Sequence, residues 1–439
     1  MSNKVASDIL SSIKNPIFRE YAKIYSNIYA NYLEQIQAKG LKLDEYRGEE
    51  QAIALEKLRQ RGVAFRNEGK SLYLNWISPA CEACRKGINS LTFFISLMCH
   101  RHCYYCFNPN QEDYAYFREN KRDCQAELAQ LAKSGQKVSY LALTGGEPLL
   151  HHQETIDFFT LAQEKFRRAH TRLYTSGDLL DQDILQQLQD AGLDEVRFSV
   201  KLEDDPQLRK KVYDRISLAK EYIPNVLVEM PVIPGTLQEM KELLRILDNL
   251  GIEGINLLEF CFPFHNREHF QKESFKVKNP PFLTLYDYWY AGGLPISQSE
   301  LECLKLLEFA LDQELSIGVH YCSLENKHTG QVYQQNLKQK SSGLAYLSPK
   351  DYFLKTAKVF GEDIPTVLRI FKRKNNSQFQ INGDHQFLEF HVKEVKTLKG
   401  LDLEVGISSS ILEERSDGTY LRELKIDLTY PEIFDIRAI

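Results

Sequence analysis

The chain has 439 residues, of which 43% are hydrophobic and 26% are charged, with a formal net charge of −5 at pH 7. This composition is ordinary for a globular protein, and the length predicts about three domain-sized units. The negative charge and the lack of a long Lys/Arg run argue against a nucleic-acid partner. No run approaches the ~18 apolar residues of a membrane span. The start, MSNKVASDIL, lacks the apolar core of a signal peptide, so we expect a cytoplasmic protein with no membrane partner.

The N-terminal part is predicted to be helical as far as residue 61, because its apolar residues recur at helical spacing. Two short apolar runs, 63–66 and 71–77, then flank the polar turn Asn67–Lys70. That pattern is typical of a β-hairpin.

A C-x2-C pair, Cys81 and Cys84, follows the hairpin. The chain holds nine cysteines, and five of them fall between residues 81 and 106, which favours metal or redox use over a disulfide framework. Such pairs often bind metal. The pair is therefore predicted to supply two ligands of an auxiliary iron–sulfur cluster, or else of a mononuclear iron or zinc. A pair of buried thiols without metal is the alternative.

Cys99, Cys103 and Cys106 follow in a C-x3-C-x2-C spacing, directly after a predicted strand over 91–97. Three thiolates at this spacing can bind three irons of one [4Fe-4S] cube and leave the fourth iron open. Zinc would prefer four ligands arranged as two pairs, and buried core thiols are a further alternative.

From residue 91 onward, predicted strands and helices alternate. A strand over 138–143 ends at Thr144-Gly145-Gly146-Glu147-Pro148, and a later one ends at Thr175-Ser176-Gly177. Ser199 lies on the next strand, with Arg197 on the same face. Repeated alternation favours a parallel α/β barrel, whose ligands gather at the carboxyl ends of the strands.

Together, the cysteine triplet and the GGEP element resemble the radical S-adenosylmethionine (radical SAM) superfamily over residues 91–265. The resemblance implies that SAM chelates the open iron, and that one electron from the cluster breaks its sulfonium to give a 5'-deoxyadenosyl radical. It also implies a set of cofactor-binding residues, namely Tyr105, Gly145, Gly146, Glu147, Ser176 and Ser199. The adenine contacts of the family have no matching stretch here, because Val228–Gly235 replaces it.

Two cysteines beyond the sixth strand are further candidates. Cys261 could donate a hydrogen atom or bind a metal, although a lone cysteine between aromatic residues is often simply buried. Cys322 ends a hydrophobic strand and would complete a three-thiolate set with Cys81 and Cys84. His320 could share its face, or serve only as a structural histidine. Four aromatic residues could line a substrate channel or simply pack in the interior, namely Tyr286, Tyr288, Trp289 and Tyr290.

From about residue 349, short alternating runs separated by turn signals indicate a small antiparallel β domain. The predicted strands cover 367–372, 379–381, 387–392, 401–407 and 420–428. The predicted fold is thus a partial (β/α)6 radical SAM barrel with an N-terminal helical segment and a C-terminal antiparallel β domain. The predicted divisions are an N-terminal segment over 1–77, the barrel over 78–265, an auxiliary segment over 266–348 and the β domain over 349–439.

The resemblance implies an enzyme that abstracts a hydrogen atom from its substrate. We expect a ribosomally synthesised peptide, modified by crosslinking, epimerisation, or backbone rearrangement and excision. A separate precursor-binding protein and an electron donor such as flavodoxin or ferredoxin would be its partners. The alternatives are an enzyme of small-molecule, cofactor or lipid biosynthesis, and a non-catalytic cluster-bearing partner.

Overall fold

The computed structural model describes residues 10–282, 284, 292–337 and 343–439, and the chain forms two compact units. The first, which we call the barrel unit, comprises Arg47–Lys278 and Trp289–Lys327. The second, which we call the C-terminal sheet unit, comprises Met1–Tyr46, Asn279–Tyr288 and His328–Ile439. The four aromatic residues predicted to line a channel, Tyr286, Tyr288, Trp289 and Tyr290, lie outside the described residues.

The described part of the barrel unit is built on a nine-stranded sheet in the order β1-β2-β11-β8-β7-β6-β5-β4-β3. Six neighbouring strands run parallel in chain order, namely β3 (Ser90–Phe94), β4 (Tyr140–Thr144), β5 (His170–Thr175), β6 (Glu195–Phe198), β7 (Asn225–Val232) and β8 (Gly254–Glu259). The predicted six-stranded parallel partial barrel is therefore confirmed.

The sheet extends beyond these six strands. β11 (Gly318–Cys322) pairs parallel with β8, although about sixty residues separate them in the sequence. β2 (Ser71–Leu74) then pairs antiparallel with β11, and β1 (Ala64–Arg66) pairs antiparallel with β2. The predicted hairpin thus lies at one end of the sheet, and Cys322 comes to lie opposite Ser71.

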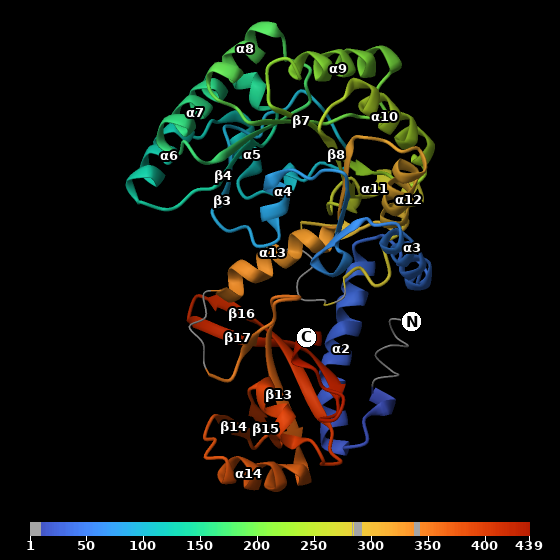
Figure 1. Ribbon diagram of the computed structural model, residues 1–439, viewed down its shortest axis with the longest axis vertical. Helices are drawn as coiled ribbons and strands as arrows, with labels where there is room; N and C mark the ends of the chain where they lie inside the picture. Colours follow the sequence, from blue (N-terminus) through green and yellow to red (C-terminus); the bar gives the residue numbers. More distant parts are fainter. Residues whose placement is uncertain (1–9, 283, 285–291, 338–342) are drawn as a thin grey trace. The chain divides into compact units, whose positions relative to one another are not determined.

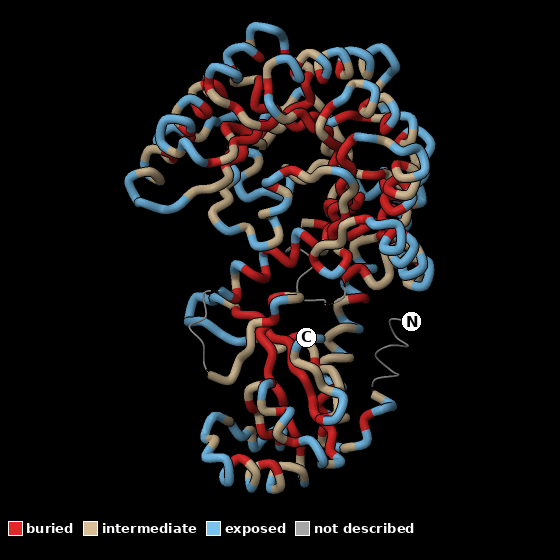
Figure 2. The backbone as a smooth tube through the Cα atoms, in the orientation of Figure 1, coloured by how far each residue is buried: buried red, intermediate tan, exposed pale blue. Residues whose placement is uncertain are grey.

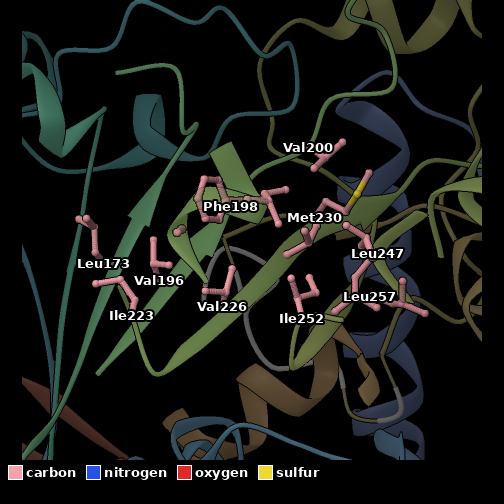
Figure 3. Close-up of a cluster of buried hydrophobic side chains, with 14 of the residues drawn as sticks. Leu173, Val196, Phe198, Val200, Ile223, Val226, Met230, Leu247, Ile252 and Leu257 are labelled. Carbon is pink, nitrogen blue, oxygen red and sulfur yellow. The ribbon is translucent and has the colours of Figure 1, made fainter. Parts of the chain in front are cut away.

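Helices cover the outer, convex side of this sheet (Figure 1). They are α6 (Cys124–Lys133), α7 (His152–Lys165), α8 (Gln182–Asp190), α9 (Pro206–Ala219), α10 (Leu237–Leu250) and α12 (Ser299–Asp312). In α10 the buried residues are Met240, Leu243, Leu244 and Leu247, a spacing that presents one apolar face to the strands. Figure 3 shows Leu247 packed near Met230 and Leu257 of the sheet, and Figure 2 shows the strands as the buried layer.

Short elements lie on the inner side of the sheet, where Figure 1 places α4 (Pro79–Cys84). Pro79 suits the first turn of a helix, and the Ser78 hydroxyl accepts the Ala80 N–H at 3.3 Å. Ser78 also donates to the Glu195 carboxylate of β6 at 2.6 Å. These contacts fix α4 against the inner face. The remaining elements of the barrel unit are α3 (Gly48–Gln60), α5 (Tyr114–Glu119), β9 (Cys261–Phe262), α11 (Arg267–Lys272) and β10 (Leu294–Pro295), and α13 (Leu324–Leu337) begins in it.

The C-terminal sheet unit is antiparallel, with the strand order β14-β15-β13-β16-β17 and β12 paired to β13. Its strands are β12 (Tyr346–Leu347), β13 (Leu354–Phe360), β14 (Phe379–Asn382), β15 (Phe387–Phe390), β16 (Val405–Arg415) and β17 (Gly418–Thr429). The long helix α2 (Pro16–Ala38) packs on this sheet, and its Phe18 ring stacks on Phe360 at 4.6 Å between centroids. The predicted antiparallel C-terminal domain is confirmed.

One predicted strand of that unit is wrong. Residues 367–372 lie in helix α14 (Ile364–Arg373). Pro365 sits in its first turn, and Val367 and Phe371 are buried four residues apart, which is helical rather than strand spacing. Within the part of the chain that the structure describes, no helix is both long and apolar enough to cross a membrane.

Candidate active site

Cys99, Cys103 and Cys106 lie together in the loop that follows β3. Burial raises the pKa of Cys106, and the nearby thiols of Cys103 and Cys99 raise it further. The Cys99 sulfur accepts the Arg101 backbone N–H at 3.4 Å. The structure therefore brings the three predicted ligands of the first cluster within electrostatic reach of one another.

The GGEP turn after β4 is fixed directly to this loop. The Gly146 N–H donates to the Ser96 carbonyl at 3.1 Å, and the Glu147 N–H donates to the Met98 carbonyl at 2.8 Å. A Cβ atom at Gly146 would collide with the Met98 carbonyl group. The second glycine is therefore required for the close approach of two backbones.

The Glu147 carboxylate is occupied by the protein itself. It accepts the Thr175 hydroxyl at 2.7 Å, the Ser176 N–H at 2.7 Å and the Leu149 N–H at 3.2 Å. These bonds join the carboxyl end of β4 to that of β5. Glu147 thus orients the turn, whereas the backbone of Gly145 and Gly146 lies against the cluster loop.

An arginine that the sequence analysis did not single out clamps the same loop. The Arg101 guanidinium pairs with Asp178 at 2.5 Å after β5 and with Asp204 at 2.9 Å after β6. Hydrogen bonds from Arg101 and His100 hold the pKa of Asp178 at about 2, although burial alone would raise it. The loop is therefore tied to the ends of two strands. An Arg inside a C-x3-C spacing carries no sequence signal for this role.

Lys201 is a second residue that sequence reasoning missed. Its side chain is buried after β6, and its charge lowers the pKa of both Cys99 and Cys106, against the burial that raises them. In the described ranges, no hydrogen bond or ion pair engages its ammonium group. The ammonium is therefore available to an anionic group bound beside the cysteine loop.

Two other predicted cofactor-binding residues have distinct settings. Ser199 is exposed, and its N–H donates to the Thr175 carbonyl at 3.0 Å. The Tyr105 ring packs near Phe260 at 5.8 Å between centroids, and its hydroxyl donates to Glu203 at 3.4 Å.

A second set of thiols meets on the inner side of the sheet. Cys81 and Cys84 lie on α4, and Cys322 ends β11. Burial raises the pKa of Cys322 to about 12, and the thiols of Cys84 and Cys81 contribute to that rise. Burial likewise raises the pKa of Cys81, with a contribution from Cys84. The structure therefore brings together the three residues predicted for a second centre.

Side-chain donors and cations surround this second set. Cys81 accepts hydrogen bonds from Arg197 at 3.4 Å and Asn256 at 3.3 Å, and Cys322 accepts one from Asn326 at 3.3 Å. Burial would lower the pKa of Lys327, but Cys322, Glu229, Cys261 and Cys84 together raise it. Positive charge beside thiols favours the thiolates that bind metal.

Across residues 10–282, 284, 292–337 and 343–439, no group of three or more His, Cys, Asp and Glu side chains is arranged to hold a metal ion. Each thiolate of an iron–sulfur cluster binds a different iron. Such thiolates lie around a cluster rather than around one point.

His320 and Cys261 each have a defined place. Both ring nitrogens of His320 form hydrogen bonds, with Ser71 at 2.9 Å and with Asn256 at 2.8 Å. His320 is therefore a structural histidine. Burial and the nearby Arg197 lower its pKa to about 3, so it is neutral. Cys261 is buried on β9, and burial raises its pKa to about 12.

With this geometry described, the known proteins can be compared. Residues 93–270 match the profile of the Radical SAM superfamily. This match agrees with the fold and with the cysteine loop, and residues 93–270 are similar to the Radical SAM superfamily. The family implies SAM and a [4Fe-4S] cluster. The three thiols suit such a cluster, and Lys201, which no hydrogen bond or ion pair engages within the described residues, suits an anionic ligand beside it.

Two curated relatives are similar over parts of the chain. A protein of Methanocaldococcus jannaschii that carries the name of a glycyl-radical enzyme activating enzyme is 29% identical over 210 residues, 46% of this chain and 55% of that protein. A protein of Methanococcus aeolicus that carries the name of a GTP 3',8-cyclase is 28% identical over 127 residues, 28% of this chain and 41% of that protein. The chain thus spans about half the length of the curated relatives it matches.

Two solved structures are similar to parts of the chain. Streptococcus suis SuiB bound to its precursor peptide SuiA has a TM-score of 0.39 and 13% identity, over 72% of this chain and 65% of that one. The enzyme anSMEcpe with bound AdoMet and the Cp18Cys peptide has a TM-score of 0.33 and 18% identity, over 40% of this chain and 52% of that one.

Proposed function

We propose that this protein is a radical SAM enzyme that holds a cluster on Cys99, Cys103 and Cys106. It would cleave SAM reductively at that cluster and abstract a hydrogen atom from a peptide. A [4Fe-4S] cluster and SAM bound there would supply the 5'-deoxyadenosyl radical. The observation that carries the assignment is the direct backbone bonding of the GGEP turn to the loop of the three cysteines, at 3.1 Å from the Gly146 N–H and 2.8 Å from the Glu147 N–H.

The chain's own residues have separate tasks in this proposal. Lys201 holds the carboxylate of SAM through opposite charge. The backbone of Gly145 and Gly146 lies where it can accept the amino group, with Glu147 keeping the turn in place. Ser176, Ser199 and Tyr105 complete the pocket wall, and Arg101 keeps the loop in register with the strand ends.

A second iron–sulfur cluster at Cys81, Cys84 and Cys322 is part of the proposal. Its support is the convergence of these thiols from α4 and β11, together with the donors and cations around them. Three thiolates leave one iron of a cube without a protein ligand from this set. Cys261, on β9, would be an additional thiol that donates a hydrogen atom or binds the metal.

Two observations favour a polypeptide substrate. The Methanocaldococcus relative is named for acting on an enzyme, which is itself a polypeptide. In the described part of the C-terminal sheet unit, β17 ends the sheet and pairs with β16 alone. An unpaired edge can bind an extended peptide through backbone hydrogen bonds. A precursor-binding protein, a flavodoxin or ferredoxin as electron donor, and a cytoplasmic location complete the proposal, which includes no nucleic acid.

The second candidate is a small-molecule substrate, and the match to the protein named as a GTP 3',8-cyclase favours it.

One experiment separates the two. The reconstituted enzyme is given SAM, a reductant and a deuterated peptide made from a short reading frame beside its gene. The peptide proposal predicts deuterium in 5'-deoxyadenosine and an altered peptide mass. A pool of deuterated cellular small molecules that labels 5'-deoxyadenosine, with no transfer from the peptide, would contradict it.

A further inference from the structure

Cys81 has the most extensive set of hydrogen-bond donors among the predicted cluster ligands in the described residues. Its sulfur accepts the Arg197 Nη2–H at 3.4 Å and the Asn256 Nδ2–H at 3.3 Å. These donors come from neighbouring parts of one sheet, since Arg197 lies on β6 and Asn256 on β8. By contrast, the Cys99 sulfur accepts a backbone N–H from Arg101.

The Asn256 amide has no freedom to turn away. Its nitrogen also donates to the Glu229 carboxylate at 2.7 Å, and its oxygen faces His320 Nδ1 at 2.8 Å. Because that oxygen can only accept, His320 carries its proton on Nδ1, and Nε2 accepts the Ser71 hydroxyl at 2.9 Å. The chain of bonds from Ser71 through His320 therefore orients the amide N–H toward Cys81.

Arg197 is held equally firmly. Its Nε donates to Glu195 at 2.5 Å, Nη1 donates to Glu229 at 2.6 Å, and Nη2 donates to Ser78 at 3.0 Å as well as to Cys81. The guanidinium is buried and fully charged. Its positive charge cannot move away from the sulfur.

Hydrogen bonds and positive charge at a cluster sulfur stabilise the reduced cluster, which carries more negative charge, and so raise its reduction potential. We propose that Arg197 and Asn256 are positioning residues that orient the Cys81 thiolate and raise the reduction potential of the second cluster, with His320 holding Asn256 in place. This inference rests on the proposed second cluster.

The test uses the full chain with Cys99, Cys103 and Cys106 changed to Ala, so that one cluster remains after anaerobic reconstitution with iron and sulfide. Its midpoint potential is measured by a redox titration followed by EPR. Asn256→Leu keeps the volume but removes the donor, and the midpoint should become more negative. Asn75→Leu is the matched control, because the Asn75 amide donates to the carbonyls of Leu315 and Ile317 and not to sulfur.

Two further variants separate tuning from loss of structure. Arg197→Lys keeps the charge and should leave the midpoint closer to the parent than Arg197→Met does. His320→Leu frees the Asn256 oxygen and should give a smaller shift in the same direction as Asn256→Leu. If the cluster assembles in Asn256→Leu and its midpoint potential equals that of Asn75→Leu, the tuning role is overturned while the second cluster itself stands. A parent that assembles no cluster would overturn the second centre, and this inference with it.

Discussion

The two thiol sets of the barrel unit are built in different ways. Cys99, Cys103 and Cys106 lie on a loop that backbone bonds and the Arg101 clamp hold in place. Beside them is the ammonium of Lys201, which has no ion pair within the described part of the chain. Cys81, Cys84 and Cys322 lie on a helix and a strand end, and buried side chains donate to their sulfurs. The first arrangement leaves one ammonium group available to a charged ligand, whereas the second is part of the sheet's own polar core.

The largest effect is expected where the loop and the GGEP turn touch. Gly146→Ala has no space for its methyl group against the Met98 carbonyl, so the loop must move and the first cluster should be lost. Overpacking of this kind costs about 1–3 kcal/mol or more. Iron content and 5'-deoxyadenosine formation measure it, and we expect four irons fewer and no SAM cleavage, while the second cluster stays.

Gly383→Ala is the control for that change, because nothing lies within 4 Å of a Cβ there. A Gly146→Ala protein with full iron content would show that the turn does not support the loop.

The buried polar residues around the second thiol set should matter more for folding than for SAM binding. Glu195 is fully buried and pairs with Arg197 at 2.5 Å and His170 at 2.9 Å. Breaking a buried pair by removing one partner costs about 3–5 kcal/mol. Glu195→Gln should therefore lower the urea midpoint of the apo-protein markedly. Glu242→Gln removes an exposed ion pair with Arg245 and should change the free energy of unfolding by less than about 1 kcal/mol. Equal midpoints for the two variants would refute this contrast.

Lys201→Met tests the free ammonium of the first set. Loss of a hydrogen bond to a charged group is worth about 1.5–3 kcal/mol, or roughly 10- to 150-fold in affinity. Equilibrium dialysis with SAM should show that weakening, with the EPR signal of the second cluster unchanged. The exposed Lys211→Met on α9 is the control. Unchanged SAM affinity in Lys201→Met would remove Lys201 from the site.

The smallest effect concerns pH. The folded pKa of Asp178, about 2, lies below the ordinary value of 3.8. The pairing of Asp178 therefore stabilises the fold above about pH 4, and that stability is lost as the pH falls through 2. Partial exposure reduces the contribution to about 1 kcal/mol. Asp178→Asn should lower the melting temperature of the apo-protein clearly more at pH 6 than at pH 2.5. An equal loss at both values would contradict the assignment.

The parallel barrel and the first thiol set were accessible from the sequence because their signals are local. Three cysteines within eight residues and a GGEP turn after an apolar strand need no tertiary information. Cys322 could be proposed by its type, but its place beside α4 depends on β11 joining the sheet between β2 and β8.

The residues that sequence reasoning missed act through distant neighbours. Lys201 and Arg101 are ordinary charged residues until the strand ends bring the loop beside them. The role of Asn256 depends on its hydrogen bonds to Cys81 and His320, which the sequence does not show. The prediction of a strand over 367–372 overlooked a helical signal, because the apolar residues there recur at positions 367, 368, 370 and 371. The domain boundaries at 77, 265 and 348 remain a prediction, which limited proteolysis can test.

Iron counting with EPR on the anaerobically reconstituted protein tests the central claim of two clusters most directly. We predict about eight irons per chain, of which about four survive when Cys99, Cys103 and Cys106 are changed to Ala and none when Cys81, Cys84 and Cys322 are changed as well. About four irons in the wild type, all lost in the first triple variant, would contradict it.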